Sequence, residues 1–171
     1  PHKIAQKGVL RTFQNIRLFK EMSVAENIMA GCHTKSKQKW YHSIIHTKAY
    51  KEDELKHWKK VEELMEFFGL SEFAAIPTAD LSYGVQRKVE MARALAADPE
   101  LLILDEPAAG LNENETIELT RIIKKIKEMG LGIMMIEHDM DMVMSLTDYI
   151  TVINFGKEIS QGLPSFVQDD P

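Results

Sequence analysis

The sequence predicts an α/β fold built on a parallel sheet. Two short apolar runs, Leu101–Leu104 and 132–136, have the length and aliphatic content of strands that are buried on both faces, which is typical of parallel sheets. An amphipathic helical pattern separates these runs, with apolar residues at Leu119, Ile122, Ile123, Ile126 and Met129. A strand, a helix and a second strand in this order indicate a βαβ unit.

The first part of the chain predicts one strand followed by helices. Residues 9–13 have the composition of a short strand that leads into a loop at Gln14. A helix is expected over 23–30, because Ser23 is a favourable N-cap and Glu26 completes a capping box three residues later. A basic connector at 33–51 precedes a longer helix that Gly69 is placed to end, with apolar residues at Leu55, Trp58, Val61, Leu64, Met65 and Phe68.

A further helix is predicted to begin at Leu81-Ser82-Tyr83-Gly84. Its apolar positions are Val89, Met91, Ala92, Leu95 and Ala96. Ser82 and Gly84 therefore lie at a helix N-terminus, where free backbone N–H groups and the helix dipole favour an anion. Gly84 would let a phosphate approach the backbone closely. The simpler interpretation is an ordinary serine N-cap.

Polar residues follow each of the two buried strands. Asp105 and Glu106 come directly after the first strand, and ligands of open α/β sheets bind at such strand ends. One carboxylate could hold Mg²⁺ through its water shell, while the other could orient or deprotonate an attacking water. His138 follows the second strand and could hydrogen-bond a γ-phosphate. The simpler interpretation is that Asp105 and Glu106 are solvated acidic residues at the end of a core strand. His138 would then be a surface or core histidine whose hydrogen bonds are satisfied.

Composition and charge narrow the class of protein. A chain of 171 residues with 44% hydrophobic composition can bury one core, and its net charge of −5 argues against a nucleic-acid partner. The basic connector could contact RNA or anionic lipid, although a solvated connector is the favoured interpretation. No apolar run has the roughly 18 to 20 residues of a spanning helix, so a membrane link would run through a partner protein. The single cysteine, Cys32, suits a reducing compartment.

Taken in order, these segments resemble the ATP-binding subunit of ABC transporters. Within that family, their amino-acid sequences are most similar to those of the branched-chain amino acid importer ATPases. Thr12-Phe13-Gln14 resembles the Q-loop, and 81–86 resembles the signature motif. Residues 101–105 resemble Walker B, and Glu106 resembles the catalytic glutamate that follows it. Residues 109–112 resemble the D-loop, which here ends in Asn112, and His138 resembles the switch histidine.

The resemblance implies a P-loop NTPase-like (RecA-like) core that is incomplete at the N-terminus and carries an inserted α-helical subdomain. The core would comprise 1–22 and 98–171, and the helical subdomain would comprise about 23–97 and contain the signature motif. The resemblance also implies that ATP and Mg²⁺ are the cofactors. Glu106 and His138 would be the catalytic residues. The nucleotide would be contacted by Gln14, Ser82, Gly84, Asp105 and Asn112. Gln14 and Asp105 would also bind Mg²⁺ through water.

The same resemblance implies a homodimer, or a heterodimer with a second ATPase subunit, in which each ATP site is shared. The dimer would bind membrane-spanning permease subunits at the cytoplasmic face of a prokaryotic inner membrane. Three alternatives remain. The chain could be a lipid-export-type ABC ATPase, a non-catalytic fragment that cannot bind ATP alone, or a DNA-repair ATPase, which would require long coiled coils that the sequence lacks.

Two features depart from the family pattern. Tyr83 and Val85 occupy signature positions that commonly hold Gly and Gln. The sequence contains no Gly-x-x-x-x-Gly-Lys-Ser/Thr loop, and Gly156-Lys157 falls between two apolar runs in a pattern that indicates a hairpin turn. We therefore expect an upstream segment that carries the P-loop. The resemblance implies that the P-loop strand lies beside 101–105, so that its loss would strip neighbours from Leu102 and Leu104. We then expect an incomplete sheet with an exposed apolar edge, a partner chain that fills the gap, or a core that is assembled differently from that of the family.

Overall fold

The computed structural model describes residues 2–32 and 48–168, which fall into two compact units. The first unit ends at Ile136, and the second begins at Glu137. Each unit is described by itself. In the described part of the chain, every helix is too short or too polar to cross a membrane.

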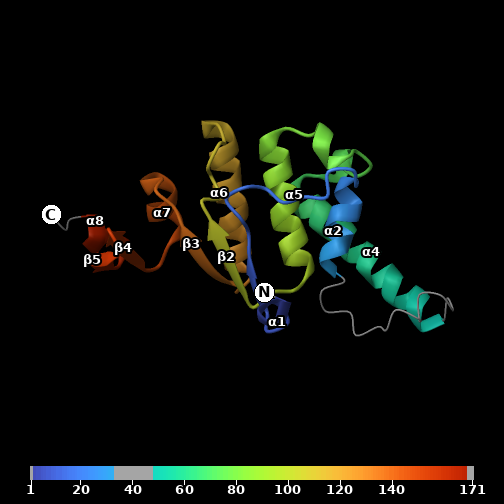
Figure 1. Ribbon diagram of the computed structural model, residues 1–171, viewed down its shortest axis with the longest axis horizontal. Coiled ribbons are helices and arrows are strands. Elements are labelled where there is room, and N and C mark those ends of the chain that lie inside the picture. Colours follow the sequence, from blue (N-terminus) through green and yellow to red (C-terminus); the bar gives the residue numbers. More distant parts are fainter. Residues whose placement is uncertain (1, 33–47, 169–171) are drawn as a thin grey trace. The chain divides into compact units, whose positions relative to one another are not determined.

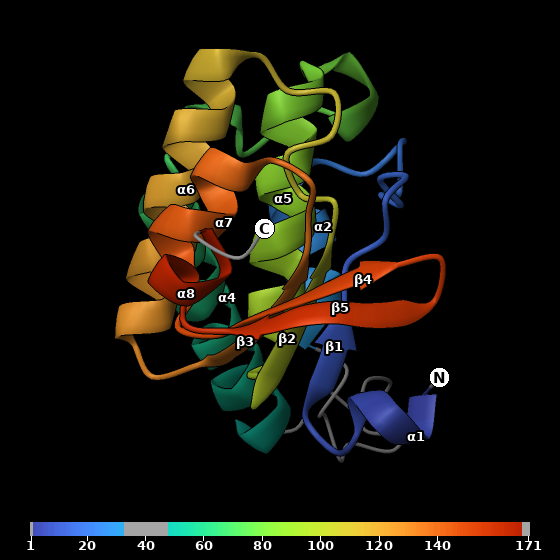
Figure 2. The same ribbon diagram turned by 90° about the vertical axis from the view of Figure 1, so that its left-hand side faces the viewer.

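A parallel three-stranded sheet forms the base of the first unit (Figure 2). Its strands are β1 (Val9–Arg11), β2 (Leu101–Asp105) and β3 (Gly132–Ile136), and β2 lies in the centre. Leu102 of β2 is in register with Leu10 on one side and with Ile133 on the other. The prediction of an α/β fold with a parallel sheet is confirmed. The first strand is shorter than predicted, because the chain leaves the ladder after Thr12 donates to the Ile103 carbonyl.

The prediction that Leu102 and Leu104 lack a neighbouring strand is wrong. β2 pairs with a strand on both sides, and both leucines are fully buried. The exposed apolar residues of the sheet lie instead on the edge strand β3, where Met134 and Ile136 are about half exposed. Because these two residues alternate along β3, the exposed apolar side chains lie on one face of that strand.

Three helices pack together beside the sheet (Figure 1). They are α2 (Val24–Cys32), α4 (Lys48–Phe68) and α5 (Tyr83–Ala96). The capping box predicted at Ser23 is present, since Glu26 accepts from the Ser23 N–H at 2.8 Å and donates its own N–H to Ser23 Oγ. The core between the three helices is apolar and includes Val24, Ile28, Val61, Phe68, Leu70, Val89 and Met91.

Several boundaries differ from the prediction. α4 begins at Lys48, inside the segment that we predicted as a basic connector, and residues 33–47 of that connector lie outside the described residues. Gly69 ends α4 as predicted, with a φ of +65° that favours glycine. Short helical segments complete this unit: α1 (His2–Ala5), η2 (Ser71–Phe73) and η3 (Thr78–Asp80).

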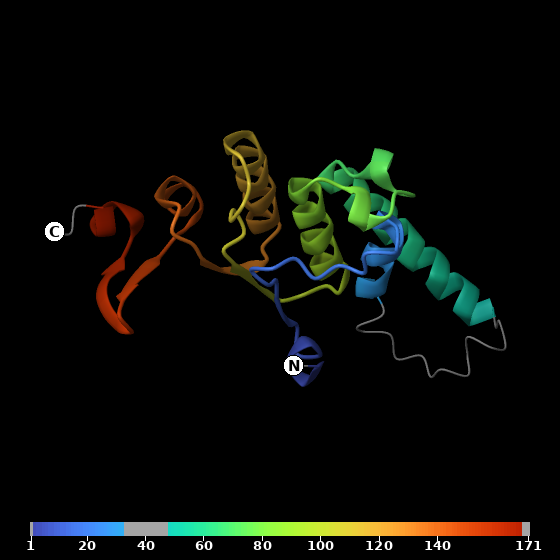
Figure 3. The same ribbon diagram turned by 45° about the horizontal axis from the view of Figure 1, so that its top comes forward.

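The helix α6 (Glu113–Glu128) connects β2 and β3 and has an apolar face of four buried residues: Leu119, Ile122, Ile123 and Ile126. Figures 1 and 3 show this helix alongside β2. The prediction that Met129 belongs to the buried face is wrong, because the helix has ended by that residue and its side chain is exposed.

The second unit contains a β-hairpin between two short helices. Its elements are α7 (Met140–Leu146), β4 (Ile150–Asn154), β5 (Lys157–Gly162) and α8 (Pro164–Gln168). Phe155 and Gly156 form the turn with φ values of +46° and +75°, as a two-residue hairpin loop requires (Figure 2). Gly156-Lys157 therefore lies in the predicted hairpin.

Candidate functional site

The end of β2 places two carboxylates at the edge of the sheet. Asp105 is the last residue of the strand, and Glu106 follows it with a φ of +45°. A residue other than glycine rarely adopts this left-handed conformation, so the surrounding structure must hold it. The Glu106 N–H donates to the Ile136 carbonyl of the neighbouring strand end at 2.8 Å. The backbone of Glu106 is thus anchored to the end of β3.

The loop after β1 brings Gln14 to the same place. Gln14 Nε2 donates to Glu106 Oε2 at 2.8 Å, which joins residues that are 92 positions apart in the sequence. Arg11 Nη2 contacts Asp105 Oδ2 at 2.7 Å in an exposed ion pair. Three of the predicted site residues, Gln14, Asp105 and Glu106, therefore lie together.

The chemistry of these side chains fits a hard divalent cation. Asp105 offers a carboxylate, and the hydrogen bond to Glu106 uses the amide nitrogen of Gln14, which leaves its carbonyl oxygen as a ligand atom. Among the residues that the structure describes, no three of His, Cys, Asp and Glu are grouped as a metal cage. A cation held by one or two protein oxygens, with waters and phosphate oxygens completing its shell, is the arrangement typical of Mg²⁺.

The start of α5 forms a second group. Ser82 is the N-cap of this helix, and its Oγ accepts from the Val85 N–H at 3.4 Å. A Cβ atom on Gly84 would lie 2.4 Å from Oε1 of Glu115, so the carboxylate of Glu115 occupies the space beside this glycine. A larger side chain at position 84 would therefore displace the Glu115 carboxylate, so packing within the chain favours a glycine here whether or not a phosphate approaches it.

Glu115 also links α5 to the segment that ends in Asn112. Asn112 caps α6: its Oδ1 accepts from the Glu115 N–H at 3.0 Å, and its own N–H donates to Glu115 Oε2 at 3.0 Å. On the same side, a Cβ on Gly110 would lie 3.2 Å from the Tyr83 ring. Ser82, Gly84 and Asn112 are thus brought together through Glu115, a residue that sequence reasoning did not identify.

His138 belongs to the second unit. Its side chain is exposed, its backbone N–H donates to Glu137 Oε2 at 2.9 Å, and its Nδ1 lies 3.6 Å from the same oxygen. The carboxylate of Glu137 is itself almost fully buried. The catalytic role of His138 stays a prediction.

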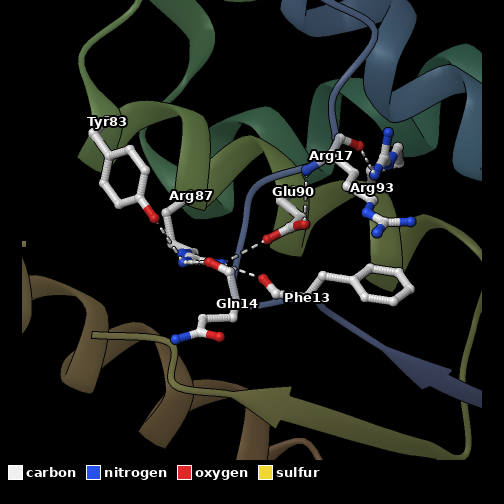
Figure 4. Close-up of polar contacts among 7 residues, drawn as sticks. All are labelled: Phe13, Gln14, Arg17, Tyr83, Arg87, Glu90 and Arg93. Atoms are coloured by element: carbon white, nitrogen blue, oxygen red, sulfur yellow. Dashed lines mark hydrogen bonds and ion pairs between the residues drawn. The ribbon is translucent and has the colours of Figure 1, made fainter. Parts of the chain in front are cut away.

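A buried ion pair within α5 was not predicted. Arg87 and Glu90 are 1% and 3% exposed, and Arg87 Nη1 lies 2.9 Å from Glu90 Oε2 (Figure 4). Nearby, burial lowers the pKa of the Arg93 guanidinium, and the charge of Glu90 opposes that shift. Two charged residues three positions apart on an otherwise apolar helix face were the signal for this pair in the sequence.

Comparison with known proteins agrees with this geometry. A family profile described as ABC transporter matches residues 1–109. BraF of Pseudomonas aeruginosa, a high-affinity branched-chain amino acid transport ATP-binding protein, is 42% identical over 171 residues, which is 99% of this chain and 67% of BraF. LivG of Escherichia coli K12, which carries the same description, is 38% identical over 170 residues and is covered to 67%.

A solved structure shows the same fold. The ADP conformation of MJ1267, an ATP-binding cassette of an ABC transporter, superimposes with a TM-score of 0.79 at 27% identity, covering all of this chain and 68% of that one. The chain therefore belongs to the ABC transporter family, as the profile and the identity to BraF show. The relatives named for branched-chain amino acid transport confirm the resemblance that the sequence motifs suggested.

Proposed function

We propose that this chain is the ATP-binding and ATP-hydrolysing subunit of an ABC transporter that powers the uptake of branched-chain amino acids. The observation that carries the proposal is the contact between Gln14 and Glu106 at the end of β2. It places a side chain that can reach a metal or a water beside a carboxylate that can act as a base. The solute is proposed from BraF and LivG, because no residue of this site would touch it.

In this proposal, Glu106 accepts a proton from the water that attacks the γ-phosphate, and the amide of Gln14 orients Glu106 or that water. Asp105 would hold Mg²⁺, which would neutralise charge on the phosphates when bound. The Arg11 ion pair with Asp105 is exposed, so it can exchange for a cation at low cost. His138 would hydrogen-bond the γ-phosphate.

The test of this step is the substitution Glu106→Gln in the complete protein. Loss of a well-placed base lowers the rate by about 10² to 10⁴, while ATP affinity stays within a few-fold of the parent protein because the amide keeps the shape of the side chain. The measurement is steady-state ATP turnover beside equilibrium binding of ATP. Turnover within a few-fold of the parent would show that Glu106 is not the base. If neither the parent nor the variant binds ATP, the chain is better explained as a non-catalytic protein.

We further propose that two ATPase subunits, identical or different, share each site, with Ser82, Gly84 and Asn112 facing the nucleotide of the partner subunit. A mixing experiment tests this arrangement. Ser82→Glu would repel a phosphate but is tolerated at a helix N-terminus, and Glu106→Gln removes the base. If the site is shared, a mixed dimer has one site with both changes and one intact site, so its turnover exceeds that of either pure variant. Turnover no higher than either variant would overturn the shared site.

A membrane-spanning permease subunit is the second proposed partner, with the ATPase bound peripherally at the cytoplasmic face of a prokaryotic inner membrane. We infer from the family resemblance that a permease helix binds near Gln14 and the helices that follow it. A groove of about 540 Å³ is present there, lined by residues that include Phe13, Arg17, Phe19, Gly31, Arg93 and Ala97. The substitution Phe19→Cys allows this contact to be tested by chemical cross-linking. We expect a strong cross-link to the native permease and no cross-linked product when the permease is absent.

A further inference from the structure

Arg87 is a buried cation of α5 that donates hydrogen bonds both within its own helix and to the loop after β1. Its Nη1 donates to the Phe13 carbonyl and to Glu90, each at 2.9 Å. Its Nη2 donates to the Gln14 carbonyl at 2.9 Å and to Tyr83 Oη at 3.0 Å. Every N–H of the two terminal nitrogens therefore has an acceptor, as Figure 4 shows.

Glu90 and Arg93 hold the other end of the same loop. Glu90 Oε1 accepts from the Arg17 N–H at 3.3 Å, and Arg93 donates to the Arg17 carbonyl. Residues 12–19 form neither helix nor strand, so their backbone groups need partners from elsewhere. Figures 1 and 3 show this loop passing across α5, which supplies the partners of Phe13, Gln14 and Arg17.

The loop in turn directs Gln14. Its backbone carbonyl is fixed by Arg87 of α5, while its side chain reaches Glu106 at the end of β2. We propose that Arg87 and Glu90 are positioning residues, which fix the Gln14 loop to the helix that begins at the signature motif. A displacement of α5 would then withdraw Gln14 from Glu106. This inference rests on the proposed function of Gln14 and Glu106.

Tyr83 explains one departure from the family pattern. A glycine at this position would offer Arg87 no side-chain acceptor, whereas the tyrosine hydroxyl completes the set of four. The tyrosine ring also packs over Gly110, where a Cβ atom would come within 3.2 Å. We therefore assign Tyr83 to the same positioning network, in contact with the segment that leads to Asn112.

The direct test is amide hydrogen exchange at Arg17 in the intact subunit. Arg87→Lys keeps the charge beside Glu90 but cannot span the acceptors that the planar guanidinium reaches, and Tyr83→Phe removes one bond while keeping the ring. The matched control is Lys88→Gln, which breaks a 2.6 Å ion pair with Glu118 of α6 and leaves Arg87, Glu90 and Tyr83 unchanged. We expect exchange to accelerate about tenfold in Arg87→Lys, about threefold in Tyr83→Phe and less than about twofold in the control. Equal exchange in all three variants would overturn the proposal.

ATP turnover separates positioning from a general structural role. Arg87→Lys should lower kcat about tenfold, with KM for ATP changed by less than about threefold. In a Gln14→Ala background the same substitution should lower kcat by less than about twofold, because Arg87 acts through Gln14. Equal losses in both backgrounds would overturn the proposal. If Gln14→Ala alone leaves kcat unchanged, the proposed role of Gln14 is wrong, while the exchange measurement still decides whether Arg87 fixes the loop.

Discussion

Two arginine–carboxylate pairs in the first unit have the same chemistry and opposite surroundings. Arg11 and Asp105 lie 2.7 Å apart, with side chains 54% and 20% exposed. Arg87 and Glu90 lie 2.9 Å apart, with side chains 1% and 3% exposed. The pair with the shorter distance is therefore the more solvated one. Distance alone does not show which pair is more costly to separate.

Burial decides what each pair can do. An exposed pair exchanges its partner for water or an ion at little cost, which suits a carboxylate proposed to receive a metal. A buried pair is costly to separate, because a charge left alone in the interior has lost its water. The buried pair also bonds a loop that has no secondary structure of its own. The comparison indicates that the first pair is exchangeable and the second holds structure.

The largest expected effect comes from breaking the buried pair on one side. Arg87→Ala leaves Glu90 buried without its cation and releases the Phe13 and Gln14 carbonyls, so we expect a loss of about 3–5 kcal/mol in the free energy of unfolding. Urea denaturation of the intact protein measures it. Replacing both partners with apolar residues, Arg87→Met with Glu90→Leu, should cost less than Arg87→Ala. A loss below about 1 kcal/mol in Arg87→Ala would contradict the distinction.

The next effect tests the packing between α5 and α6. Gly84→Ala places a methyl group 2.4 Å from the present position of Glu115 Oε1, so the carboxylate must leave the capping box with Asn112. We expect a loss of about 1 kcal/mol, the usual cost of a helix cap. In a Glu115→Ala background the same change should be neutral or stabilising, because alanine is favoured over glycine within a helix. A loss that persists in that background would show that Glu115 is not what requires the glycine.

The smallest effect is expected at the exposed pair. Arg11→Ala should change the free energy of unfolding by less than about 1 kcal/mol, and the change should shrink further as salt is added. Denaturation at low and high ionic strength measures both quantities. A loss as large as that of Arg87→Ala would mean that exposure does not separate the two pairs.

The sequence by itself determined the local structure, because local structure depends on neighbouring residues. The spacing of apolar residues predicted the central strand and α6, the Ser23 and Glu26 pair predicted a cap, and Gly69 predicted the end of a helix. The motif order also identified the family and placed Asp105 and Glu106 at a strand end. Each of the structural patterns lies within one helix, one strand or one turn, whereas the family follows from the order of short motifs along the chain.

Only the tertiary structure decided which distant segments meet. The contact of Gln14 with Glu106 spans 92 positions, and that of Arg87 with the Gln14 carbonyl spans 73, so no local spacing encodes either one. The same reason explains the wrong prediction for Leu102 and Leu104, since the strands that flank β2 come from positions 9–11 and 132–136, far from it in the sequence. The lack of space for a side chain at position 84 likewise depends on Glu115, which another helix brings to it.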